Sequence, residues 1–122
     1  MYEVTTEVSF SGAHKLRDYD GPCENIHGHN WLVKAIVRCD KLDSVGIGVD
    51  FKVLRGRLRQ AVEAFDHNDL NEVLDPLGLN PSSENIARYI FENLERKLNN
   101  ATITVYRVDV FETPGNSAAY FR

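Results

Sequence analysis

The order of its patterned segments constrains the fold of this chain more than any single residue does. Apolar and polar residues alternate over 2–10 and again over 29–40, and this period of two predicts half-buried strands. Two segments with apolar residues at helical spacing come next. Two more alternating segments follow, at 101–111 and 117–121. The predicted order is therefore strand, strand, helix, helix, strand, strand.

The two predicted helices carry N-terminal signals. Asp50 is the predicted N-cap of the first helix. Ser82 is the predicted N-cap of the second helix, and Glu84 lies in its first turn, where the helix dipole favours a negative charge. Helices that are grouped together indicate an α+β fold with an antiparallel sheet of about four strands. A minor further strand is expected at 47–49, and the exposed sheet edges favour a closed homo-oligomer.

Length and composition limit the classes of protein. At 122 residues we expect a single domain over 1–122. Hydrophobic residues at 43% and charged residues at 26% are typical of a soluble globular protein, and no apolar run approaches the roughly 20 residues that cross a bilayer. No secretory signal is visible, so we expect a cytoplasmic protein with no membrane partner. The net charge of −4 argues against nucleic-acid binding, which needs a surplus of basic residues.

Three of the four histidines fall within sixteen positions: His14, His27 and His29. In an extended segment, His27 and His29 project from one face about 6.6 Å apart at their bases, while Gly28 points the other way. Antiparallel pairing could bring His14, at the end of the first strand, beside them. Three histidine ligands and an open fourth position are typical of a catalytic zinc site. Iron, copper or nickel would fit the same spacing, and histidines without any metal are the alternative.

The two cysteines are too few for a disulfide framework, although one bridge between them stays open. Cys39 continues the apolar face of 31–37 and is predicted to lie in the core. Cys23 lies four residues before His27. A bound cation would lower the pKa of its thiol and give a thiolate that can take a proton. The alternatives for Cys23 are a small packed residue or a fourth metal ligand.

Two further positions carry candidate acid–base or binding groups. Asp66 precedes His67, and a carboxylate beside an imidazole can orient the ring and raise its basicity. The alternative is a polar turn that ends the first helix. Glu112 ends an alternating segment, where its carboxylate could accept two N–H bonds from a planar heterocycle. The alternative for Glu112 is an ordinary surface carboxylate.

Together these residues resemble the 6-pyruvoyltetrahydropterin synthase / 6-carboxytetrahydropterin synthase family of the tunnelling fold. The resemblance covers nearly the whole chain. It runs through Phe10-Ser11-Gly12-Ala13-His14, Cys23-Glu24-Asn25-Ile26-His27-Gly28-His29, Val49-Asp50-Phe51, Asp66-His67-Asn68-Asp69-Leu70-Asn71, Asn80-Pro81-Ser82-Ser83-Glu84-Asn85 and Glu112-Thr113-Pro114. It implies a four-stranded antiparallel sheet with two helices packed on one face.

The resemblance also implies a role for each candidate residue. The three histidines His14, His27 and His29 would bind Zn²⁺, which lowers the pKa of substrate hydroxyls. Cys23 would be the general base, Asp66 and His67 its proton-relay partners from a neighbouring subunit, and Glu112 the anchor for the pterin ring. The family's active sites lie between the subunits of a homohexamer made of two trimers.

The implied activity is zinc-dependent conversion of 7,8-dihydroneopterin triphosphate to 6-carboxytetrahydropterin, with release of acetaldehyde and triphosphate, in queuosine biosynthesis. Three residues separate Cys23 from the His-Gly-His, and this spacing is typical of these bacterial enzymes. The alternatives are 6-pyruvoyltetrahydropterin synthesis, a non-catalytic metal- or pterin-binding oligomer, and zinc-dependent hydrolysis. The chain departs from the family at Gly12, usually alanine, and Phe65, usually leucine. Glu24 has no assigned role.

Overall fold

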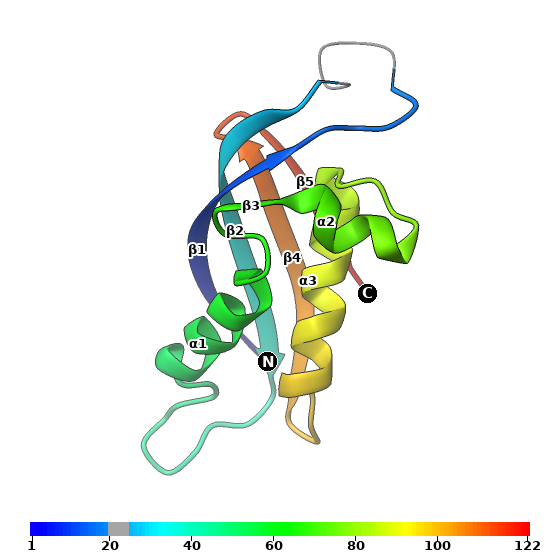
Figure 1. Ribbon diagram of the computed structural model, residues 1–122. Helices are drawn as coiled ribbons and strands as arrows, with labels where there is room; N and C mark the ends of the chain where they lie inside the picture. The colour runs from blue at the N-terminus through cyan, green and yellow to red at the C-terminus, as the bar shows by residue number, and fades with distance from the viewer. Residues whose placement is uncertain (20–24) are drawn as a thin grey trace.

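A computed structural model describes residues 1–19 and 25–122 of the chain. It contains one five-stranded sheet in the order β3-β1-β2-β4-β5, with the helices against it (Figure 1). The strands are β1 (Tyr2–His14), β2 (His27–Cys39), β3 (Asn68–Asp69), β4 (Ile103–Thr113) and β5 (Asn116–Phe121). The helices are α1 (Phe51–Val62), α2 (Leu70–Leu74) and α3 (Ser83–Leu98), and a 3₁₀ turn, η2 (Asp75–Leu77), follows α2.

Strands β1 and β2 form the long antiparallel pair that organises the sheet. Their register runs without a break from Tyr2 opposite Cys39 to His14 opposite His27. Strand β4 pairs with the other side of β2, and β5 pairs with β4, both antiparallel. Only β3 is parallel to its neighbour, and it pairs with β1 at Gly12 and Ala13 alone. The short β3 therefore leaves most of one edge of β1 without a strand partner among the described residues.

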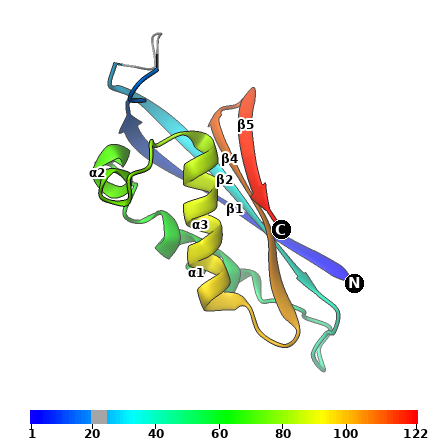
Figure 2. The ribbon, with the colours of Figure 1, turned by 90° about the vertical axis from the view of Figure 1, so that its right-hand side faces the viewer.

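The hydrophobic core lies between one face of the sheet and the helices. Figure 2 shows the helices on this face, while the opposite face of the sheet carries no helix from residues 1–19 or 25–122. Alternate residues of β2 and the apolar stripe of α3 supply much of this core, and Trp31, Phe65 and Phe91 are its largest side chains. Cys39 is buried in line with them, as predicted.

The α+β prediction is confirmed, and the two main helices begin where their caps predicted. The side chain of Asp50 accepts a hydrogen bond from the backbone N–H of Lys52 at 2.7 Å, and Ser82 accepts one from Asn85 at 3.2 Å. Each bond satisfies an N–H that the first turn of the helix leaves free. No helix in the described ranges, 1–19 and 25–122, is both long and apolar enough to cross a membrane.

Two details of the prediction are corrected. The minor strand expected at 47–49 is absent, because the carboxylate of Asp43 accepts hydrogen bonds from the N–H groups of Val45 and Ile47 and folds the segment into a turn. The sheet instead gains β3, and α2 follows directly after it. A two-residue strand and a five-residue helix are too short to produce a periodic pattern in the sequence.

Candidate metal centre

The pairing of β1 with β2 brings the three histidines together. His14 lies opposite His27, and Gly12 lies opposite His29, so all three rings project from the core face at one end of the sheet. The ring centroid of His14 lies 4.5 Å from that of His27 and 5.3 Å from that of His29. The centroids of His27 and His29 are 4.7 Å apart. His14 is only 1% exposed. The centre is thus a continuation of the core face beyond its apolar residues.

Backbone carbonyls fix the orientation of two of these rings. The Nδ1–H of His14 donates to the carbonyl oxygen of Pro81 at 2.7 Å, and that of His27 donates to the carbonyl oxygen of Asn25 at 2.7 Å. These bonds place the proton of each neutral ring on Nδ1 and leave the lone pair on Nε2. Metal-binding histidines in proteins are held in the same manner.

Trp31 forms the floor of the centre and has no role in the prediction. Its ring lies edge-on to His14 at 4.9 Å and to His29 at 5.5 Å between centroids. Its Nε1–H donates to the carbonyl oxygen of Gly12 at 3.1 Å, and the side chain is fully buried. A tryptophan two residues after His29, on the same face of a strand, was the available signal.

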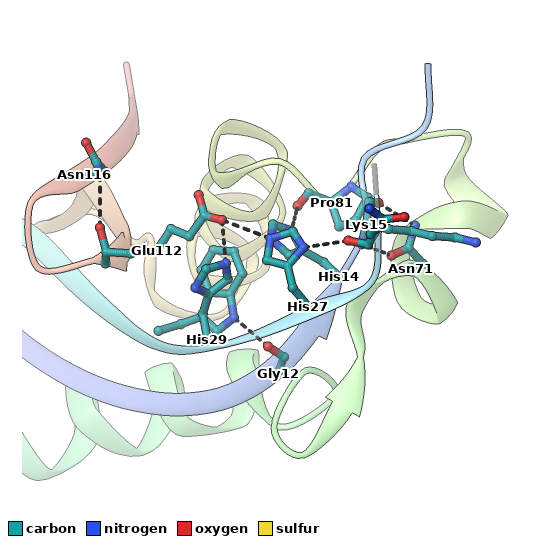
Figure 3. Close-up of polar contacts among 12 residues, drawn as sticks. Gly12, His14, Lys15, His27, His29, Asn71, Pro81, Glu112 and Asn116 are labelled. Carbon is teal, nitrogen blue, oxygen red and sulfur yellow. Dashed lines mark hydrogen bonds and ion pairs between the residues drawn. The ribbon is translucent and has the colours of Figure 1, made fainter. Parts of the chain in front are cut away.

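Glu112 occupies the side of the cluster that was expected to be open. It follows Val108 and Val110 on the core face of β4, so its carboxylate reaches the histidines from the neighbouring strand (Figure 3). Its Oε1 lies 3.1 Å from Nε2 of His14, 3.7 Å from that of His27 and 2.8 Å from that of His29. One ligand atom from each of the four residues lies within 4.8 Å of all the others.

The donor set fits a metal ion. The Nε2 of His29 is buried and, despite its closeness to Glu112, makes no contact with hydrogen-bond geometry. Burial lowers the pKa of His29 below the usual 6.5, although the charge of Glu112 opposes this shift, so the ring favours its neutral, metal-binding form. A buried nitrogen without a hydrogen-bond partner lowers the stability of the fold unless a ligand from outside the chain binds it. A metal cation would be such a ligand. Three imidazole nitrogens and a carboxylate oxygen are ordinary zinc ligands.

Asp66 and His67 form a pair, but they lie apart from the three histidines. The carboxylate of Asp66 lies 2.9 Å from Nδ1 of His67 and accepts a hydrogen bond from the N–H of Ser11 at 3.1 Å. The His67 side chain is 81% exposed, and its backbone has a φ of +58°. The pair is therefore more than a polar turn, because it is fixed to the edge of β1.

His67 borders a surface hollow of about 470 Å³. Ser11, Ala13, Gly28 and Asn30 line this hollow together with His29. The first four alternate with the histidines along β1 and β2, so they lie on the face of the sheet away from the three imidazoles. Within one chain, the structure does not bring His67 to the metal centre.

Cys23, the predicted general base, and Glu24 lie outside the described residues. The segment that leads toward them is described as far as residue 19, and two asparagines hold it. Asn71, which is 4% exposed, exchanges two hydrogen bonds with the backbone of Lys15, and Asn80 exchanges two with the backbone of Arg17. Each amide acts as a neighbouring strand would, directly after His14. Both asparagines belong to matched motifs, but their roles were not predicted.

Comparison with known proteins decides the family. The model of the family described as 6-pyruvoyl tetrahydropterin synthase matches residues 3–122. The chain belongs to this family. It is 36% identical to the 6-carboxy-5,6,7,8-tetrahydropterin synthase of Synechocystis sp., with 99% of this chain and 94% of the relative covered. It is 30% identical to the protein of the same name from Bacillus subtilis, with 98% and 84% covered.

A solved structure gives the same answer for the fold. The 6-pyruvoyl tetrahydropterin synthase of Caenorhabditis elegans superposes with a TM-score of 0.81 at 30% identity, with 100% of this chain and 97% of that chain covered. The tunnelling fold of the 6-pyruvoyl tetrahydropterin synthase family is thereby confirmed for this chain. Membership makes the chain a lyase-type tetrahydropterin synthase, and its His14, His27, His29 and Glu112 form a group whose ligand atoms can hold a metal ion.

Proposed function

We propose that this chain converts 7,8-dihydroneopterin triphosphate to 6-carboxy-5,6,7,8-tetrahydropterin in a zinc-dependent reaction that releases acetaldehyde and triphosphate. The product would serve queuosine and related 7-deazapurine biosynthesis. The observation that carries the proposal is the convergence of three imidazoles on one point, two of them oriented by backbone carbonyls, in a chain 36% identical to a protein named for this product. The absence of a membrane-spanning helix among the described residues agrees with a cytoplasmic enzyme.

His14, His27 and His29 would hold the zinc ion. When bound, the ion supplies Lewis acidity that makes the hydroxyls of the substrate side chain more acidic. The carbonyls of Pro81 and Asn25 keep two of the rings in the tautomer that binds metal. The buried Trp31 beneath the rings excludes water from that side of the centre.

Protons would be moved by Cys23 and by the Asp66–His67 pair. Asp66 faces Nδ1 of His67 and so keeps the proton on that nitrogen, which leaves Nε2 free to accept one. Cys23 would remove a proton from the substrate side chain as its carbon chain breaks. Glu112 would hold the pterin ring by accepting hydrogen bonds from its 2-amino group and ring N–H.

We further propose that the complete active site needs two copies of the chain, within a homohexamer of two trimers. His67 is largely exposed on the face away from the three histidines, so its partner must come from outside its own chain. The long free edge of β1 and the outer edge of β5 can each pair with another copy. Such pairing would protect both edges and bring His67 of one chain to the metal of the next.

One alternative uses the same residues. Elimination of triphosphate without cleavage of the carbon chain would give 6-pyruvoyltetrahydropterin, and the likeness to the Caenorhabditis elegans structure supports it. A non-catalytic metal- or pterin-binding oligomer is a second alternative. It would keep the histidines but have no use for the Asp66–His67 pair.

Incubation with 7,8-dihydroneopterin triphosphate, with and without a chelator, tests the proposal. Mass spectrometry should detect 6-carboxytetrahydropterin and acetaldehyde, and the chelator should abolish both. A 6-pyruvoyl product without acetaldehyde would favour the first alternative. Turnover that is equal in the parent, Cys23→Ala and His67→Ala proteins would contradict the assigned proton chemistry, and no turnover in the metal-loaded parent would favour the non-catalytic oligomer.

A further inference from the structure

With its histidines neutral, the metal centre contains acceptor atoms that face one another with no proton donor between them; the His14–Glu112 contact is a hydrogen bond only if the His14 ring carries a second proton. His14 and His27 each donate their Nδ1–H to a backbone carbonyl, so their Nε2 atoms present lone pairs to the centre. The Oε1 of Glu112 lies 3.1 Å and 3.7 Å from these two atoms, and an ionised carboxylate also only accepts. Lone pairs this close repel unless a cation lies among them.

The distances match a shared coordination shell. A tetrahedral zinc ion with bonds of about 2.0–2.1 Å separates neighbouring ligand atoms by about 3.3 Å. The three Nε2-to-Oε1 distances, 2.8, 3.1 and 3.7 Å, lie on both sides of this value. We infer that Glu112 is the fourth ligand of the metal in the resting enzyme, and that it leaves the metal when substrate binds. The second half of this inference rests on the proposed function.

Glu112 is less firmly held than the two histidines that donate to backbone carbonyls. His14 is 2% exposed at its side chain and is bound to Pro81, and His27, although 28% exposed, is bound to Asn25. The side chain of Glu112 is 26% exposed and has no such backbone partner among the described residues. Among residues 1–19 and 25–122, the carboxylate of Glu112 makes side-chain hydrogen bonds or ion pairs with the three imidazoles alone. Glutamate has three rotatable side-chain bonds, so its carboxylate can turn away while β4 stays in place.

The exchange would make the metal accessible only to ligands that carry the pterin ring. The same carboxylate cannot bind both the metal and the pterin ring in bidentate fashion, so the ring donors of the substrate would draw Glu112 away and open a position for the side-chain hydroxyls. A ligand with hydroxyls but no such donors would leave Glu112 in place and the centre closed. This arrangement would suppress the general hydrolysis that an always-open zinc site allows.

The resting half is tested on protein loaded with Co²⁺ in place of zinc, with azide as a probe for an open position. The parent and Glu63→Gln, a control at an exposed carboxylate, should show little change in the visible spectrum with azide. Glu112→Ala and the isosteric Glu112→Gln should bind azide at least about 10-fold more tightly and hold the metal at least about 10-fold more weakly against a chelator. Equal azide binding and equal metal affinity in the parent and both Glu112 variants would overturn the inference.

The substrate half uses 7,8-dihydroneopterin, which lacks the triphosphate, and glycerol as a diol without the ring. The pterin should change the Co²⁺ spectrum of the parent, because its side-chain hydroxyls take the position that Glu112 leaves, whereas glycerol should leave the spectrum unchanged. An unchanged spectrum at saturating pterin would overturn the exchange. The separate turnover assay decides the proposed function, so the two failures are distinguishable.

Discussion

The metal centre and the Asp66–His67 pair differ in how completely one chain builds them. The three histidines project from paired strands onto a buried tryptophan, and two of them are held by backbone carbonyls. His67 is 81% exposed and is oriented by a single carboxylate. The first region uses the rigidity of the core, so one chain is enough to build it. The second is fixed at its base only, which agrees with the proposal that it works on a site in another copy.

Loss of a metal ligand should have the largest effect and should affect only one of the two regions. We expect His29→Ala to lower zinc affinity by more than about 100-fold, because a ligand costs more than the roughly 10- to 100-fold loss that follows removal of a supporting group. His67→Ala should bind zinc as the parent does. Competition with a chromophoric chelator measures the zinc affinity of both variants. Equal losses of affinity would mean that His67 supports the metal as much as His29 does.

Loss of His67 should act on turnover instead. We expect kcat to fall by about 10²- to 10⁴-fold in His67→Ala, the range for removal of a general acid or base, with the metal content unchanged. Asp66→Asn should show a smaller fall, because the ring keeps its place but loses the carboxylate that fixes its tautomer. Steady-state kinetics on metal-loaded protein provides the test, and an unchanged kcat in His67→Ala would remove the pair from the mechanism.

A mixture of the two defective chains separates a shared site from a self-contained one. His29→Ala and His67→Ala, unfolded and refolded together, should recover up to about one quarter of the parent activity if each site takes its metal ligands and its relay from different copies. Each variant refolded alone is the control. A mixture no more active than its components would show that the two regions do not meet between subunits.

The sequence predicted the residues of both regions more fully than their arrangement. Alternation along β1 and β2 placed His27 and His29 on one face, and strand pairing accounted for His14. The position of Glu112 beside them depends on the register of β4 against β2, including a shift between Ile36 and Val37, and no local pattern encodes that register. The supporting carbonyls are equally invisible, because every residue type carries one.

The asparagines after His14 should matter to the metal centre by stabilising the chain around it. Asn71→Ala removes two hydrogen bonds to Lys15 from a buried position and should lower the free energy of unfolding by about 2–3 kcal/mol. Asn80→Ala removes an equivalent pair to Arg17 at a more exposed position and should cost about 1 kcal/mol. Urea unfolding compares them, and an equal cost would mean that burial does not set the difference.

Gly12 lies between the two regions, and its substitution should cost less than that of Asn71. A Cβ at this position would overlap the Cδ1 of Leu70 and lie 3.1 Å from the carbonyl oxygen of Phe65. Gly12→Ala should therefore cost about 1–2 kcal/mol, because the buried Leu70 must shift. The strain falls on the turn that carries His67, so kcat should fall modestly while zinc affinity stays unchanged.

Phe65→Leu provides the matched second change, because Gly12 and Phe65 are the two departures from the family pattern that the sequence resemblance indicates. The Phe65 ring packs on Phe10, 5.8 Å away between centroids, and Phe65 and Leu70 belong to the same core cluster, so a smaller side chain at 65 would leave space in the core that contains Leu70. The double variant should thus be more stable than the sum of the single losses by at least about 0.5 kcal/mol. Strict additivity in urea unfolding would mean that these two departures from the family arose independently of each other, and that the space at Gly12 serves the close approach of Leu70 alone.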